Sequence, residues 1–167
     1  MHGMHAHFSR DWLIENGNLP EKAGNVEIYS IRDFVTWKQY QPAMLLHEMA
    51  HQIHYRKRAQ YGPRIEAAFQ AAKASGKYDL VQYIGGQELP AYAMSTAYEY
   101  FAESAESFFT SQRFWNDYYP FINSELQAFD HTAWSLVAEV FGVNGSKYLA
   151  QFQTPKDISM DPEIARF

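Results

Sequence analysis

Two histidines four residues apart, His47 and His51, flank a glutamate in the segment HEMAH. On a helix, residues at this spacing differ by about 40° around the axis and by about 6 Å along it. Both imidazoles can then reach one ion, and zinc accepts imidazole nitrogens at about 2.0–2.1 Å. Glu48 directly follows the first histidine, where its carboxylate can reach a water molecule at the ion without binding the ion. The spacing therefore predicts a metal site that activates water.

This His-Glu-x-x-His spacing is typical of zinc peptidases. Apolar side chains fill much of the segment around it: Met44, Leu45, Leu46, Met49, Ala50 and Ile53. They predict a largely buried helix, as an active-site helix crossing a small domain requires. The alternative is an ordinary buried helix whose two polar histidines find partners within the protein.

His54 lies seven residues after His47, on the same face of the predicted helix. It cannot reach the same ion, because it lies about 10 Å further along the axis. Sites that take three histidines from one segment need a glycine after the second histidine, and this chain has His54 there and Lys57 at the third-ligand position. We expect His54 at the rim of the site or behind a ligand, and a plain surface histidine is the alternative.

A third metal ligand must come from elsewhere, because a catalytic zinc ion takes three protein ligands and keeps one position open. The chain has no cysteine, but Glu99, Glu103 and Glu106 follow helical spacing in STAYEYFAESAESFF. Acidic groups beside a buried aromatic face are costly unless something such as a cation compensates them. The alternatives are a capping role for Glu99 after Thr96 and a solvated face for the other two. The residues alone leave Glu99 and Glu103 open as the third ligand.

The composition suits one domain, residues 1–167, with one core, because 47% of the 167 residues are hydrophobic. The net charge of −5 argues against nucleic-acid binding, which needs a basic patch. No apolar run reaches the length of a membrane span. The start, MHGMHAHFSRDW, lacks the apolar stretch of a signal peptide. We expect residues 1–7 to be a disordered end.

The elements that must position these residues are mostly helices. Helical patterns cover seven segments: 9–17, 32–38, 42–60, 63–76, 95–112, 120–129 and 131–141. Pro42 and Pro63 stand at first-turn positions, where proline is tolerated. Gly76 and Gly142 are placed to end helices, and Asp130 is placed to cap the last one.

Two other segments favour strands. Residues 26–31 alternate apolar and polar side chains, and residues 78–84 are rich in β-formers and precede the turn formed by Gly85 and Gly86. Together the patterns predict an α+β fold that is predominantly helical, with a small β-sheet and one long helix that carries the candidate site.

In combination, these motifs resemble the anthrax lethal-factor-like zinc metallopeptidases, a branch of the gluzincins. HEMAH, AYA at 91–93 and EYFAES at 99–104 carry the resemblance, with Tyr92 seven residues before Glu99 and Glu99 48 residues after His51. The segments W-L-I-E-N-G at 12–17, V-E-I at 26–28 and Y-I-G-G at 83–86 are similar to an uncharacterised branch of bacterial and fungal proteins. The resemblance covers residues 7 to about 115.

The resemblance implies a zincin-like catalytic domain in which the two histidines of HEMAH and Glu99 bind zinc (Zn²⁺). It implies Glu48 as the general base and Tyr92 as a hydrogen-bond donor to the oxyanion of the reaction. Glu103 would lie behind the ligands and orient a ligand histidine. Relatives often carry a further N-terminal stretch, sometimes with a secretion signal. The chain is then the catalytic part of a secreted or extracellular protein.

The expected function is that of a zinc endopeptidase acting on a peptide or protein substrate. Glu48 would take a proton from the attacking water and pass it to the leaving amine. We expect the strand at 26–31 to border the cleft and to pair with an extended substrate backbone.

One alternative is a zincin-like module that binds a peptide or partner and cuts little, although such a module has no need of Glu48. Another alternative is a zinc hydrolase of non-peptide amides. The oligomeric state cannot be inferred from the sequence.

Overall fold

The longest element of the computed structural model, which describes residues 3–147, is the helix α3 (Met44–Ala74). It begins two residues after Pro42 and carries HEMAH in its N-terminal half. Gly76 follows its end with a φ of +68°, and its N–H donates to the carbonyl of Lys73. Glycine adopts this left-handed conformation at no steric cost, so the predicted end of the helix is confirmed.

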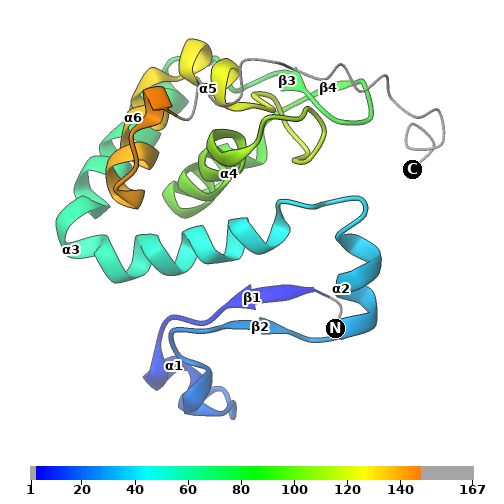
Figure 1. Cartoon of the computed structure of the whole chain (residues 1–167). Helices are drawn as coiled ribbons and strands as arrows, with labels where there is room; N and C mark the ends of the chain where they lie inside the picture. The colour runs from blue at the N-terminus through cyan, green and yellow to red at the C-terminus, as the bar shows by residue number, and fades with distance from the viewer. Residues whose placement is uncertain (1–2, 148–167) are drawn as a thin grey trace.

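α3 continues through Pro63, where we predicted the start of a separate helix. Proline lacks an N–H group and its ring crowds the carbonyl of the preceding turn, so it bends a helix when it does not break it. Figure 1 shows α3 changing direction in its middle part. Tyr61 and Ile65, on either side of the proline, are both buried, and their packing holds the two halves in one bent helix.

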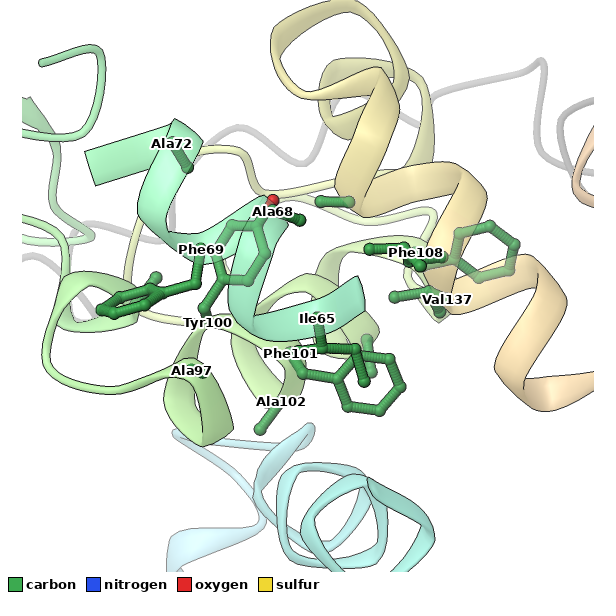
Figure 2. Packing of buried hydrophobic residues seen from close by; sticks show 14 of the residues in the cluster. Ile65, Ala68, Phe69, Ala72, Ala97, Tyr100, Phe101, Ala102, Phe108 and Val137 are labelled. Carbon is green, nitrogen blue, oxygen red and sulfur yellow. The ribbon is translucent and has the colours of Figure 1, made fainter. Parts of the chain in front are cut away.

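The core lies between the C-terminal half of α3, α4 (Ala97–Phe109) and α6 (His131–Phe141). Tyr100, Phe101 and Phe108 of α4 are each 2% exposed or less. Figure 2 shows these rings beside Phe69 of α3 and Val137 of α6. The aromatic face of the segment 95–109 therefore packs inward, which fixes the direction of the acidic face.

Asp130 joins α5 (Asn123–Phe129) to α6 and is buried. Its Oδ1 accepts a hydrogen bond from the N–H of Ala133 at 3.1 Å, which confirms the predicted cap. Its Oδ2 accepts from the hydroxyls of Tyr78 and Tyr100, each at 3.0 Å, and lies 3.1 Å from the Nζ of Lys77. This one carboxylate thus ties α6 to α4 and to the segment after α3.

The strands form two small antiparallel sheets. β1 (Met4–Ala6) pairs with β2 (Val26–Ile28), and β3 (Val81–Gln82) pairs with β4 (Glu88–Leu89). β2 and the β3–β4 hairpin were predicted, but β1 falls in the segment that we expected to be disordered. It is ordered because Met4 is buried and because β1 pairs in full register with β2.

Short elements complete the chain: α1 (Arg10–Glu15), η1 (Pro20–Lys22), α2 (Ile31–Trp37) and η2 (Tyr92–Met94). Ser9 and Ser30 cap α1 and α2 through their hydroxyl oxygens. In Figure 1, β1 and β2 lie on one side of the N-terminal half of α3, and α4 lies on the other. The fold is predominantly helical with small sheets, and no helix within residues 3–147 is long and apolar enough to cross a lipid bilayer.

Candidate metal centre

His47 and His51 project from α3 toward Glu99, which α4 holds opposite them. One ligand atom from each of the three residues lies within 4.8 Å of the other two. Glu99 Oε2 is 3.0 Å from His47 Nε2 and 3.4 Å from His51 Nε2. Two imidazole nitrogens and one carboxylate oxygen form a donor set that suits a divalent metal ion. The structure thus brings together the three residues that the resemblance implied as ligands.

Glu99 combines the two roles that its position in the sequence suggested. Its backbone N–H donates to the Oγ1 of Thr96 at 3.1 Å, so Thr96 caps the helix. Its carboxylate faces the histidines instead of closing the capping box. Burial raises the pKa of Glu99, but the hydrogen bonds with His47 and His51 outweigh this effect and lower the pKa to about 2. The carboxylate is therefore ionised at neutral pH, as metal binding requires.

Glu106 is the carboxylate that contacts the other ring nitrogen of His47. Its Oε1 lies 2.6 Å from His47 Nδ1, whereas the nearest oxygen of Glu103 lies 3.6 Å away. We expected Glu103 in this role. Residue 106 comes seven positions after Glu99 and is rotated from it by only about 20°, whereas residue 103 is rotated by about 40°. A carboxylate at this nitrogen fixes the orientation and tautomer of a ligand histidine.

The three glutamates concentrate negative charge around one imidazole. Burial opposes the charged form of His47, but hydrogen bonds with Glu106 and Glu99 more than offset this effect and raise the pKa of His47 to about 11. Burial also raises the pKa of Glu103 and of Glu106. A proton on the ring compensates part of this charge, and a divalent cation at Nε2 would compensate it more fully. The residues present therefore fit a metal ion.

Glu48 lies in the cleft beside the histidines. Its Oε2 accepts a hydrogen bond from the backbone N–H of Ala6 at 2.8 Å, which restrains the carboxylate. The cleft is lined by Glu48, the three candidate ligands, residues of β1 and Tyr92. A carboxylate held here, next to the ligands but not among them, has the placement that a general base needs.

Tyr92, on η2, lines the same cleft as Glu48 and is 47% exposed. Partial burial and the nearby charge of Glu99 raise the pKa of Tyr92. Its hydroxyl therefore keeps its proton at neutral pH. A protonated phenol at the mouth of the cleft can donate a hydrogen bond to a bound group.

His54 is buried, with 4% of its surface exposed, so the surface alternative is wrong. Its ring stacks on Tyr98 with 4.3 Å between the centroids and meets the ring of Phe101 edge-on. Burial and the neighbouring His51 lower the pKa of His54 to about 4. His54 is therefore a neutral aromatic residue in the packing behind the site, and it does not line the cleft.

β1, rather than β2, borders the cleft. Gly3 and His7, at the two ends of β1, form backbone hydrogen bonds with the segment that contains β2. Backbone groups alternate in direction along a strand, so those of Met4 and Ala6 face away from β2, and the N–H of Ala6 reaches Glu48. The prediction that the strand at residues 26–31 borders the cleft is therefore wrong, because β1 lies between β2 and the cleft.

Comparison of the chain with models of protein families, with curated proteins and with solved structures found no match. The interpretation of the site therefore depends on its residues and their geometry. Glu106 and β1 are the parts that the sequence analysis missed. The spacing of seven residues between Glu99 and Glu106 was the available signal for Glu106. β1 has only three residues, which are too few to predict a strand from the sequence.

Proposed function

We propose that the protein is a zinc-dependent endopeptidase with a zincin-like catalytic domain. One observation carries the proposal. His47, His51 and Glu99 converge from two helices, and a fourth residue, Glu48, lines the same cleft without belonging to the ligand set. Two nitrogens and one oxygen are a donor set that zinc takes in catalytic sites. Bound zinc would supply a Lewis acid that lowers the pKa of a water molecule to about 7.

The residues of the chain supply the remaining chemistry. Glu48 accepts a proton from the attacking water and then delivers it to the leaving amine. Tyr92 donates a hydrogen bond to the negative charge that develops on the carbonyl oxygen. Glu106 holds the ring of His47 in a fixed orientation. The positions of Glu106, Glu48 and Tyr92 support these roles, and so does the protonated phenol of Tyr92.

The edge of β1 that faces the cleft favours a peptide as substrate. An extended chain can add to such an edge through backbone hydrogen bonds, which are independent of the side-chain sequence. This edge lines the cleft together with Glu48, so a paired peptide would pass the general base. A hydrolase of small non-peptide amides has no use for such an edge. A module that only binds peptides would use the edge but not Glu48.

The first test removes the general base and keeps the ligands. Glu48→Gln should retain one zinc ion per chain and lose about 10²–10⁴-fold in peptide hydrolysis, the usual contribution of general acid–base catalysis. Cleavage of a peptide library, followed by mass spectrometry, measures the activity, and elemental analysis measures the metal. Glu66→Gln, an exposed position on the same helix, is the matched control and should leave both unchanged.

Removal of the metal provides the second half of this test. A chelator should abolish cleavage by the wild-type protein, and added zinc should restore it. Near-normal activity of Glu48→Gln would remove this residue from the role of base. A zinc-loaded wild-type protein that binds library peptides and cuts none would favour the binding module instead.

A further inference from the structure

The cleft continues beyond the metal ligands. A second cavity, of about 310 Å³, shares His47, Glu48 and Tyr92 with the cleft beside β1. A third, of about 510 Å³, shares Gln41 and Asp117 with the second. The three cavities therefore adjoin one another in a row from the candidate ligands to Asp117, and together we call them the groove.

The third cavity, which we name the aromatic subsite, is formed by segments far apart in the sequence. Its main walls are Trp37, Tyr40, Gln41, Tyr83, Ile84 and Asp117. Three of these six residues are aromatic, and their faces can hold the stem of a long side chain and a cation at its end. The cavity is large enough for one such side chain.

Asp117 is the charged group of the aromatic subsite. Its Oδ2 accepts a hydrogen bond from Gln41 Nε2 at 2.9 Å, and its side chain is half-buried. The ion pairs formed among residues 3–147 do not include Asp117. Within residues 3–147 this half-buried carboxylate has no cationic partner and is poorly compensated, so this position favours a ligand that carries positive charge.

The neighbouring cavity is lined by further carboxyl groups, with the ring of His47 among them. Glu48, Glu103 and Glu106 line it together with Asp117, and neither cavity has a lysine or arginine among its described lining residues. An anionic side chain would be repelled here. A neutral apolar side chain would cover Asp117 without pairing with it, which is costly for a buried carboxylate.

We infer that the aromatic subsite binds a cationic side chain, arginine or lysine, of the peptide that occupies the cleft. The charged end pairs with Asp117, and the stem lies against the rings of Trp37, Tyr40 and Tyr83. The inference rests on the proposed function only in that the occupant is a peptide. Asp117 would therefore set substrate specificity without taking part in the chemistry.

The test uses peptides that differ only in charge at one position. Each position of a library peptide carries arginine, lysine, glutamate or citrulline, which has the length of arginine but no charge. At one position, arginine and lysine should raise kcat/KM by about tenfold over citrulline, the size expected for one well-placed charge pair. Asp117→Asn keeps an acceptor for Gln41. It should bring the ratio of kcat/KM between the arginine and citrulline peptides close to one. Glu88→Gln, on β4 and outside the lining of both cavities, removes the same charge and should keep the ratio.

Binding is measured separately, so that the result does not depend on turnover. Zinc-loaded Glu48→Gln protein, with and without Asp117→Asn, is titrated into fluorescein-labelled arginine and citrulline peptides, and anisotropy gives the Kd. A preference for arginine that Asp117→Asn removes supports the subsite even if no peptide is cut, and then only the proposed function fails. Equal Kd values, or a preference that survives Asp117→Asn, overturn the subsite even if the protein is an active peptidase.

If Asp117→Asn does not fold, the dependence of the arginine preference on ionic strength provides the test. Salt screens a charge pair, so the preference of the protein with intact Asp117 for arginine over citrulline should fall as sodium chloride is raised. A preference that does not change with salt would overturn the inference.

Discussion

Glu99 Oε2 lies within 3.4 Å of one ring nitrogen of both histidines. Glu106 Oε1 lies 2.6 Å from the other ring nitrogen of His47, and Glu103 Oε1 lies 3.6 Å from it. One carboxylate is therefore placed as a ligand and the other two are placed behind a ligand. This division of roles leads to a ranking of the three glutamates by their effect on metal affinity.

Glu99→Ala should weaken zinc binding more than Glu103→Ala or Glu106→Ala. Residues that support a ligand usually contribute about 10–100-fold in affinity, and the loss of a ligand should exceed this range. Competition with a chromogenic zinc chelator measures the three affinities, and circular dichroism checks that each variant is folded. A larger loss for Glu103→Ala would identify Glu103 as the ligand.

At the level of single residues, spacing alone predicted a metal site at His47 and His51 with Glu48 beside it. It could not separate Glu99 from Glu103, because both lie on one helical face and only the resemblance favoured Glu99. Glu106 was missed as the partner of His47, because a rotation of a few tens of degrees around α4 decides which side chain reaches the ring. The sequence does not specify the relative position of two helices to that accuracy.

Among the secondary-structure elements, Asp130 is the residue that connects three parts of the fold through one carboxylate. It caps α6 and accepts hydrogen bonds from Tyr78 and Tyr100. The cap could be predicted from the residue before an apolar helical pattern. The two tyrosines could not, because they lie 30 and 52 residues away in the chain.

Asp130→Ala should lower the free energy of unfolding by about 3–5 kcal/mol, since it leaves buried polar partners unpaired. Asp130→Asn keeps an oxygen for the cap and should cost less. Urea unfolding followed by circular dichroism measures both losses, with the exposed Asp79→Asn as control. An Asp130→Ala variant as stable as the control would show that the tyrosines and Ala133 find other partners.

Helix ends were more predictable than helix continuity. Gly76 and Gly142 end α3 and α6 in the left-handed conformation, because local chemistry alone favours glycine there. Pro63 misled the prediction, because the burial of its neighbours compensates for a backbone that proline disfavours. β1 was missed for a related reason: its order depends on α3 and β2 rather than on its own three residues.

Across the whole molecule, the candidate ligands come from α3 and α4, two of the three helices that build the core. The metal ion and the packed core therefore stabilise the same arrangement. An ion that binds only the folded chain must raise the stability of the entire domain.

Zinc at about 100 times its Kd should add about 2.7 kcal/mol to the free energy of unfolding. In a chain of this size, each kcal/mol shifts Tm by about 2–4 °C, so Tm should rise by about 5–11 °C. Differential scanning calorimetry with and without zinc measures this shift. His51→Ala should abolish it; an equal shift in that variant would place the zinc elsewhere.

The aromatic subsite illustrates what no local pattern predicts. Trp37, Tyr83 and Asp117 come from three separate segments, and none stands in a motif that marks it for binding. Aromatic residues are frequent in this chain, and eight of those that the structure describes are buried. Only the tertiary structure separates those that line a groove from those that pack inside.

The ligands lie on two long, mutually packed helices, whereas the groove beyond them is walled largely by short connections. Residues 83–86 and Asp117 can therefore be exchanged for others while the ion keeps its anchors, whereas Asn116 is buried and donates hydrogen bonds to Ser107 and Pro120. On the proposed function, variants made in this way would hold the same metal and cut different peptides. One scaffold of this kind can be retargeted by engineering a pair of surface loops.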